Sequence, residues 1–127
     1  MNEFTVKEEV FELTEMMKSK FTAFIIPCKS VDDFKVRHEQ IRKANPKAKH
    51  IVYAYRIGMN SKSTDDQEPK GTAGRPLLEF LNKKNMNNTA IIVVRYYGGV
   101  QLGAGRLLRT YVNSAVNAFN KAELIEL

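Results

Sequence analysis

Apolar and polar positions along the chain form blocks that predict a series of strands and helices. Alternation with period two over His50–Gly58 is typical of a half-buried strand. The nearly continuous apolar run Thr89–Tyr97 predicts a central strand covered on both faces. Two earlier strands are predicted over Val6–Met16 and Lys20–Cys28, the latter ending near Pro27.

Three other segments show the apolar spacing of helices. The first begins at Ser30, a good N-cap residue, and ends at Asn45-Pro46. The other two are expected over about Thr72–Lys84 and Gly103–Phe119, whereas the polar segment Met59–Lys70 is predicted to be a mobile surface loop. The predicted inward-facing residues are Val31, Phe34, Ile41 and Ala44; Leu77, Leu78 and Leu81; and Leu108, Tyr111 or Val112, Ala115 and Phe119.

The order strand–strand–helix–strand–helix–strand–helix predicts a two-layer α/β (α+β) sandwich with a mostly four-stranded sheet. A length of 127 residues suits a single domain over residues 1–127. The lone Cys28 rules out an intrachain disulfide, and neither histidine has a zinc-site spacing. No apolar run approaches the roughly 20 residues of a membrane span, so we expect a cytoplasmic protein.

The formal net charge is +6, and its distribution is uneven. Residues 35–49 hold six bases against Glu39 alone, which suits either a solvated helix face or a protein-binding surface. Further downstream, Arg106 and Arg109 are spaced to share one face of the last predicted helix. Such a polarised basic surface attracts polyanions.

Two glycine-rich segments, Asp66–Pro76 and Arg95–Arg109, each lead into a predicted helix. A glycine loop before a helix exposes backbone N–H groups that suit an anion, although glycines also serve tight turns and close packing. Because loops that precede helices gather at strand ends, we expect residues 66–76 and 97–105 to lie together. The second segment is flanked by a basic patch of three arginines, Arg95, Arg106 and Arg109.

The order of these motifs resembles the YigZ/IMPACT family over about Lys20–Phe119. The matching pieces are His50–Gly58, Glu68–Pro76, Arg95–Gly99, Leu102–Gly105, and Arg109 with Tyr111. The resemblance implies the fold of the second domain of ribosomal protein S5 and a link to translation, since eukaryotic members regulate translation initiation. Bacterial members usually carry a second, ferredoxin-like domain, which we expect to be absent from a chain ending at Leu127. The chain departs from the family pattern at Val52, Gln67, Lys70 and Arg106.

We therefore expect a non-enzymatic binding module for RNA, the ribosome or a translation-linked protein, with no metal or cofactor. The alternative is an enzyme or sensor that holds the phosphate of a small ligand near Gly71–Gly74 or Gly103–Gly105. The expected anion- or nucleic-acid-binding residues are Gly71, Thr72, Gly74, Arg75, Arg95, Tyr97, Gly98, Gly99, Gly103, Arg106 and Arg109.

A second candidate set is polar and comprises His50, Asp66 and Glu68. With Asp65, the two carboxylates cluster before the first glycine loop, where they suit either Mg²⁺ or capping of the next helix. Arg95 ends a buried strand, so a structural ion pair with Asp66 or Glu68 is the alternative to a place in the basic patch.

Overall fold

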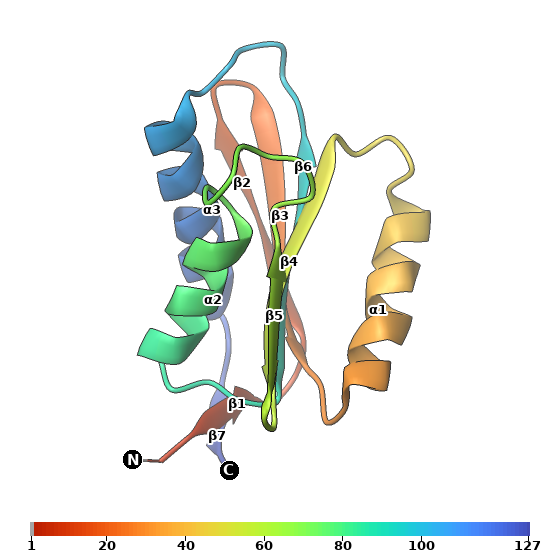
Figure 1. Ribbon diagram of the computed structural model, residues 1–127, viewed down its shortest axis with the longest axis vertical. Coiled ribbons are helices and arrows are strands. Elements are labelled where there is room, and N and C mark those ends of the chain that lie inside the picture. Colours follow the sequence, from red (N-terminus) through yellow and green to blue (C-terminus); the bar gives the residue numbers. More distant parts are fainter. Residues whose placement is uncertain (1) are drawn as a thin grey trace.

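The computed structural model describes residues 2–127 and shows an α+β fold built on one large antiparallel sheet (Figure 1). The sheet has five strands in the order β2-β3-β6-β4-β5, and each neighbouring pair is antiparallel. In that spatial order the strands are Val10–Met16, Ser19–Pro27, Thr89–Tyr96, His50–Ile57 and Asn60–Thr64. The central position of β6 agrees with its continuous apolar sequence.

Three helices cover the two faces of this sheet. The helix α1 (Val31–Ala44) lies on one face, and α2 (Gly74–Lys83) and α3 (Ala104–Phe119) lie on the other (Figure 1). The expected α+β class is confirmed. The helices cover both faces, so there are three layers rather than two, and the sheet has five strands rather than four because β5 was not predicted. Two helix-covered faces are possible because both sides of β4 and β6 are apolar.

Alternate residues along a strand therefore contribute to two separate hydrophobic cores, one on each face of the sheet. On the α2/α3 face the core includes Phe21, Leu77, Leu81, Ile91 and Tyr111. On the α1 face it includes Phe34, Ile41, Tyr55, Ile92 and Val94. The period of two along a strand makes this division unavoidable, because successive side chains point to opposite faces.

The two ends of the chain form a small sheet of their own. The strands β1 (Phe4–Val6) and β7 (Leu124–Glu126) pair antiparallel at the lower end of Figure 1. The prediction of one continuous strand over Val6–Met16 was wrong. The chain forms two strands here, because β1 ends at Val6 and β2 begins at Val10. The strand β7 was not predicted, because three exposed residues carry no periodic signal.

The predicted mobile loop over Met59–Lys70 was also wrong in its first half. Residues 60–64 form β5, which pairs with β4 through a tight hairpin at Gly58 and Met59. Gly58 has φ +60°, the left-handed conformation that such turns favour. Because β5 is an edge strand with mostly exposed side chains, its sequence is polar throughout.

The buried side of α3 differs from the predicted one, because Leu107, Thr110, Ser114 and Ala118 were not predicted to face inward. Leu108 is exposed, and Leu107 takes the inward position in its place. Thr110 and Ser114 are buried on this side, and each hydroxyl donates a 2.7 Å hydrogen bond to a carbonyl of the same helix. These bonds within the helix allow two polar residues to face the core. The apolar spacing of α3 is therefore harder to recognise in the sequence.

Candidate functional site

The candidate site lies at the end of the sheet where β6 ends and β4 begins, uppermost in Figure 1. Both glycine-rich loops reach this end and line one cavity of about 520 Å³, which we call the loop cavity. The predicted proximity of the two loops is therefore seen directly. The first loop contributes residues 67–69, and the second contributes Tyr97 and residues 101–104. His50 of β4 and Arg95 of β6 also line the cavity, together with Lys49 just before β4.

Two side chains that line the loop cavity, Arg95 and His50, belong to a row of three on adjacent strands. Phe21, Arg95 and His50 are register partners across β3, β6 and β4. The Arg95 guanidinium carbon lies 5.3 Å from the centre of the Phe21 ring. Glu68 enters this row from the first loop and is almost completely buried.

Glu68 is the centre of a buried polar network. Its Oε2 lies 2.7 Å from Arg95 Nη1 and accepts a hydrogen bond from the Tyr111 hydroxyl, while its Oε1 lies 3.3 Å from His50 Nε2. A buried carboxylate is stable only when such donors replace water. Burial, followed by the hydrogen bond to Glu68, raises the pKa of Tyr111 well above its usual range.

His50 is held on both ring nitrogens. Its Nδ1 lies 2.7 Å from the carbonyl oxygen of Asp66, and its Nε2 faces the Glu68 carboxylate. A carbonyl and a carboxylate both accept hydrogen bonds, so each ring nitrogen of His50 faces an acceptor. The second candidate set, His50, Asp66 and Glu68, is thus brought together at this point.

Arg95 does not belong to an exposed basic patch, and this prediction is corrected. Only 5% of the residue is exposed, and its guanidinium lies between the rings of Phe21 and Tyr97. Its Nη2 donates a 3.3 Å hydrogen bond to Ser19 Oγ. The alternative of an ion pair with Glu68 is the one that the structure shows.

The first glycine loop does not offer its amides to an outside anion. The Asp65 carboxylate accepts hydrogen bonds from Gly71, Ala73 and Gly74 at 2.9, 3.1 and 2.8 Å. Asp65 therefore caps α2. Of the two roles predicted for this carboxylate, capping the next helix and binding Mg²⁺, the structure shows the first. The predicted phosphate position at Gly71–Gly74 is wrong because a carboxylate of the protein already occupies it.

The other predicted residues of this loop have structural partners. A Cβ atom added at Gly74 would lie 2.5 Å from the Thr64 carbonyl oxygen, so the glycine permits close packing against β5. Thr72 is buried and donates its hydroxyl hydrogen to the Pro69 carbonyl. Arg75 is exposed on α2 and pairs with Glu79 at 3.4 Å.

Replacing Asp65 with alanine is expected to lower the free energy of unfolding by about 2 kcal/mol, the upper end for loss of an N-cap side chain. The reason is that three amides at the start of α2 lose their acceptor. Urea denaturation followed by circular dichroism measures the change. Asp32→Ala is the control, because Asp32 is exposed in the first turn of α1 and should cost less than ~1 kcal/mol. Equal losses would contradict the capping role.

The second glycine loop leaves the start of α3 open toward the loop cavity. Gly103, at φ +78°, precedes the helix, and no side chain caps the first turn. Gly103 and Ala104 both line the cavity. Gly98 and Gly99 lie further from it, and Gly98 packs against the backbone of Lys18.

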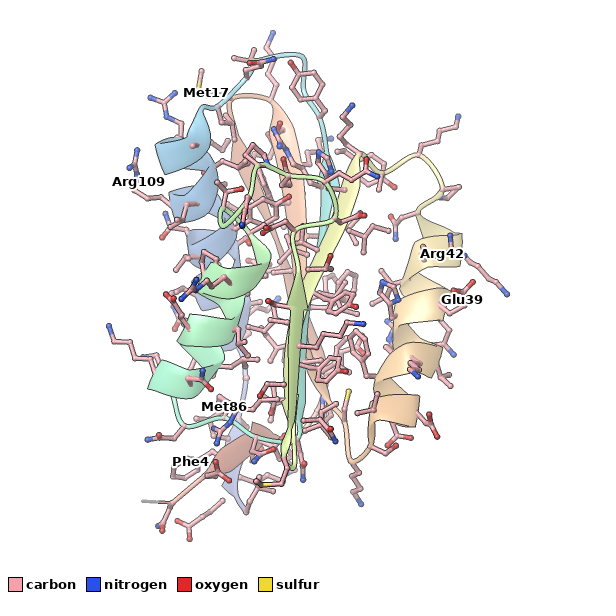
Figure 2. The ribbon with its side chains drawn as sticks, viewed as in Figure 1. Phe4, Met17, Glu39, Arg42, Met86 and Arg109 are labelled. Carbon is pink, nitrogen blue, oxygen red and sulfur yellow. The ribbon has the colours of Figure 1, made fainter. Side chains whose placement is uncertain are left out.

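Arg106 and Arg109 lie outside the loop cavity on the exposed side of α3. Arg106 contacts the Met17 sulfur in the turn between β2 and β3, and Figure 2 shows Met17 beside the first turn of the helix. Arg109 projects outward from α3 in the same figure. The two arginines therefore belong to the same end of the molecule as the cavity, as predicted, but not to its lining.

Residues 2–127 hold neither a cluster of metal ligands nor a membrane-spanning helix. Within this range no group of three or more His, Cys, Asp and Glu side chains is placed to hold a metal ion. Asp66 instead accepts a 2.6 Å hydrogen bond from the Ile51 amide. No helix in the described part of the chain has the length and apolar character needed to cross a bilayer.

The fold and its converging loops define an α+β domain with a polar cavity at one end of the sheet. Residues 17–119 match the family model of the Impact N-terminal domain. The chain is 37% identical over 126 residues to the IMPACT family member YvyE of Bacillus subtilis (strain 168), covering 97% of this chain and 58% of that protein. The chain belongs to the IMPACT family, as the motifs predicted.

Two further comparisons agree with this assignment. Identity to the IMPACT family member YigZ of Escherichia coli (strain K12) is 36% over 110 residues, which covers 80% of this chain and 54% of that protein. A crystal structure of a hypothetical protein superposes with a TM-score of 0.94 at 29% identity, over 99% of this chain and 64% of that one. The chain thus spans little more than half the length of the curated bacterial relatives.

Several residues of the site were not predicted. Lys49 and Gln101 line the loop cavity, and Ser19 supports Arg95 beneath it. Lys18 and Lys20 also reach this end, from the turn between β2 and β3 and from β3 itself. Gln101 lies in the second glycine-rich segment but has no chemical signature of its own, and the other four lie outside both segments, so only the tertiary structure shows that these residues belong to the site.

Proposed function

We propose that this domain is a non-enzymatic binding module for RNA, and that the end of the sheet with the two loops is its binding surface. The observation that carries the proposal is the pairing of the arginines. Among residues 2–127, Arg106 and Arg109 are the two arginines without a carboxylate partner. The others pair with carboxylates, namely Arg37, Arg42, Arg56, Arg75 and Arg95. Two unpaired guanidinium groups on one exposed helix face are available for phosphates.

Exposed aromatic rings beside lysines support the same function. Lys18, Lys20, Tyr96 and Tyr97 line a shallow depression, which we call the hairpin hollow. Tyr96 and Tyr97 are 36% and 44% exposed. Aromatic faces stack on unpaired bases while neighbouring cations hold the phosphates.

Tyr96 and Tyr97 would point to opposite faces of the sheet if both belonged to β6, as adjacent residues of a strand do. Both line the hairpin hollow instead, because β6 ends at Tyr96 and Tyr97 already belongs to the following loop. Two stacking surfaces are thus present at one place. A ribosomal or translation-linked setting for the RNA is what the resemblance to the IMPACT family implies.

Replacing Arg106 and Arg109 together by glutamine is expected to weaken the binding of a single-stranded RNA oligonucleotide. The plot of log affinity against log salt should become shallower by about 1.4, since each lost phosphate contact contributes about 0.7 for a single strand. Fluorescence anisotropy at several salt concentrations measures both quantities. Because both arginines are exposed, the free energy of unfolding of the variant should lie within about 1 kcal/mol of that of the parent protein.

The matched control is Lys62→Gln combined with Lys83→Gln, which also removes two exposed positive charges but on β5 and at the end of α2. If this control loses as much affinity and salt slope as the arginine variant, the binding reflects net charge alone. If neither variant differs from the parent protein, the surface is not the RNA site.

A further inference from the structure

The loop cavity carries several groups that suit a negatively charged ligand. The start of α3 opens onto it through Gly103 and Ala104, without a capping side chain. Lys49 lines it and has no carboxylate partner among residues 2–127. An uncapped helix start and a free ammonium group both favour an anion.

Arg95 gives an independent indication of a missing ligand. It lines the loop cavity and is 5% exposed, and its two terminal nitrogens are bound to Glu68 and Ser19. Its Nε N–H is the one buried side-chain polar atom in residues 2–127 that has no hydrogen-bond partner. Buried donors in folded proteins are nearly always satisfied. A ligand oxygen would reach this covered Nε only when a neighbouring side chain such as Tyr97, whose ring packs on the guanidinium, moves aside.

The carboxylate in the cavity lining does not oppose an anion. Glu68 is the one acidic residue among those that line the loop cavity, and only 3% of its side chain is exposed. Arg95, His50 and Tyr111 surround its oxygens. Arg95 compensates its charge, which leaves Lys49 and the positive end of α3 to set the potential of the cavity.

The position of Tyr97 indicates what is attached to the anion. This side chain lines both the loop cavity and the hairpin hollow, so it lies between them. Glu68 and Arg95 line the cavity and are almost completely buried, so they form its inner wall, against which a chain end fits better than a continuous strand. A ligand with its charged end in the cavity would pass over the Tyr97 ring toward Lys18 and Lys20.

We propose that the loop cavity binds a terminal phosphomonoester, with the attached nucleoside against Tyr97. The phosphate belongs either to the end of an RNA strand or to a free nucleoside monophosphate. The first source rests on the RNA-binding function proposed above, whereas the second is independent of it. The cavity then recognises a strand end, and the hairpin hollow, Arg106 and Arg109 hold the adjoining nucleotides.

The test uses one eight-nucleotide single-stranded RNA in three forms, with a 5′-phosphate, with a 3′-phosphate, or with hydroxyl groups at both ends. Adenosine monophosphate and inorganic phosphate are titrated separately by calorimetry. One phosphorylated form should bind about tenfold more tightly than the hydroxyl form, since the additional bonds are charge-assisted. Adenosine monophosphate should bind with one-to-one stoichiometry and compete with that form.

Two variants locate the phosphate. Ala104→Pro removes one amide hydrogen at the first position of α3, where proline is tolerated, and Gly103 with ψ 155° suits a residue before proline. Lys49→Gln removes the ammonium group. Each should abolish the preference for the phosphorylated end, measured as the ratio of the affinities of the phosphorylated and hydroxyl forms. Lys47→Gln, which is exposed in the same turn but outside the cavity lining, should retain the preference.

The outcomes separate this proposal from the previous one. Equal affinity for the phosphorylated and hydroxyl RNA forms, with binding that still depends on Arg106 and Arg109, overturns the cavity proposal and leaves RNA binding intact. One-to-one binding of adenosine monophosphate that is lost in Ala104→Pro, with no RNA binding, supports the cavity and overturns the RNA function. If the protein binds none of the probes, both proposals are wrong.

Discussion

Glu68→Gln is expected to lower the free energy of unfolding by about 3–5 kcal/mol, the range for breaking a buried ion pair. The substitution keeps the size of the side chain but removes the charge that balances the buried guanidinium of Arg95. It also replaces one of two acceptor oxygens, both of which are in use. The loss is large against a total stability of about 5–15 kcal/mol. Urea denaturation at pH 7 measures it.

Glu79→Gln is the matched control, because it removes a carboxylate from an exposed pair with Arg75 on α2. Exposed pairs contribute at most about 1 kcal/mol. The double variant Glu68→Gln with Arg95→Met should be more stable than Glu68→Gln alone, since it leaves no unpaired charge buried. If Glu68→Gln costs no more than Glu79→Gln, the network does not hold the first loop in place.

Gly98→Ala is expected to lower stability by about 3 kcal/mol, at the upper end for forcing an atom into a packed region. The added Cβ atom would lie 2.1 Å from the Lys18 carbonyl carbon and 2.2 Å from its oxygen. The turn cannot easily withdraw, because Met17 and Lys18 both have positive φ values in a two-residue hairpin. Thermal unfolding should show a melting temperature about 10 °C lower.

Gly99→Ala is the neighbouring control. Gly99 has φ +88°, but a Cβ atom there would meet nothing within 4 Å. Its cost is therefore limited to the left-handed conformation, about 1–2 kcal/mol. If Gly98→Ala loses no more stability than Gly99→Ala, the contact between the second glycine loop and the turn between β2 and β3 adapts to an extra methyl group.

Local pattern predicted much of the fold for clear physical reasons. The strands β3, β4 and β6 and all three helices lie within a few residues of their predicted ranges. Their alternation or helical spacing reflects how much of each face is buried. The strands β1, β5 and β7 were missed, because short or exposed strands are held by backbone pairing and need no apolar pattern.

The candidate site was predicted less completely than the fold. The two loops were correctly placed together, and the alternatives for Asp65 and Arg95 included the ones that the structure shows. The anion position at Gly71–Gly74 was wrong, because a motif does not reveal which acceptor its amides already have. The choice between Leu107 and Leu108 was also wrong, since buried hydroxyls on α3 disguise its inner side.

The sequence by itself determined the family, the α+β class and the residues that form the two loops, because these depend on residue order and local periodicity. Tertiary structure alone decided which charges are buried and which are free. Arg95 and Arg106 look alike in the sequence, yet Arg95 is 5% exposed beside Glu68 and Arg106 is exposed on α3. The reason is that burial and pairing depend on register across β3, β6 and β4, which brings together residues far apart in the chain.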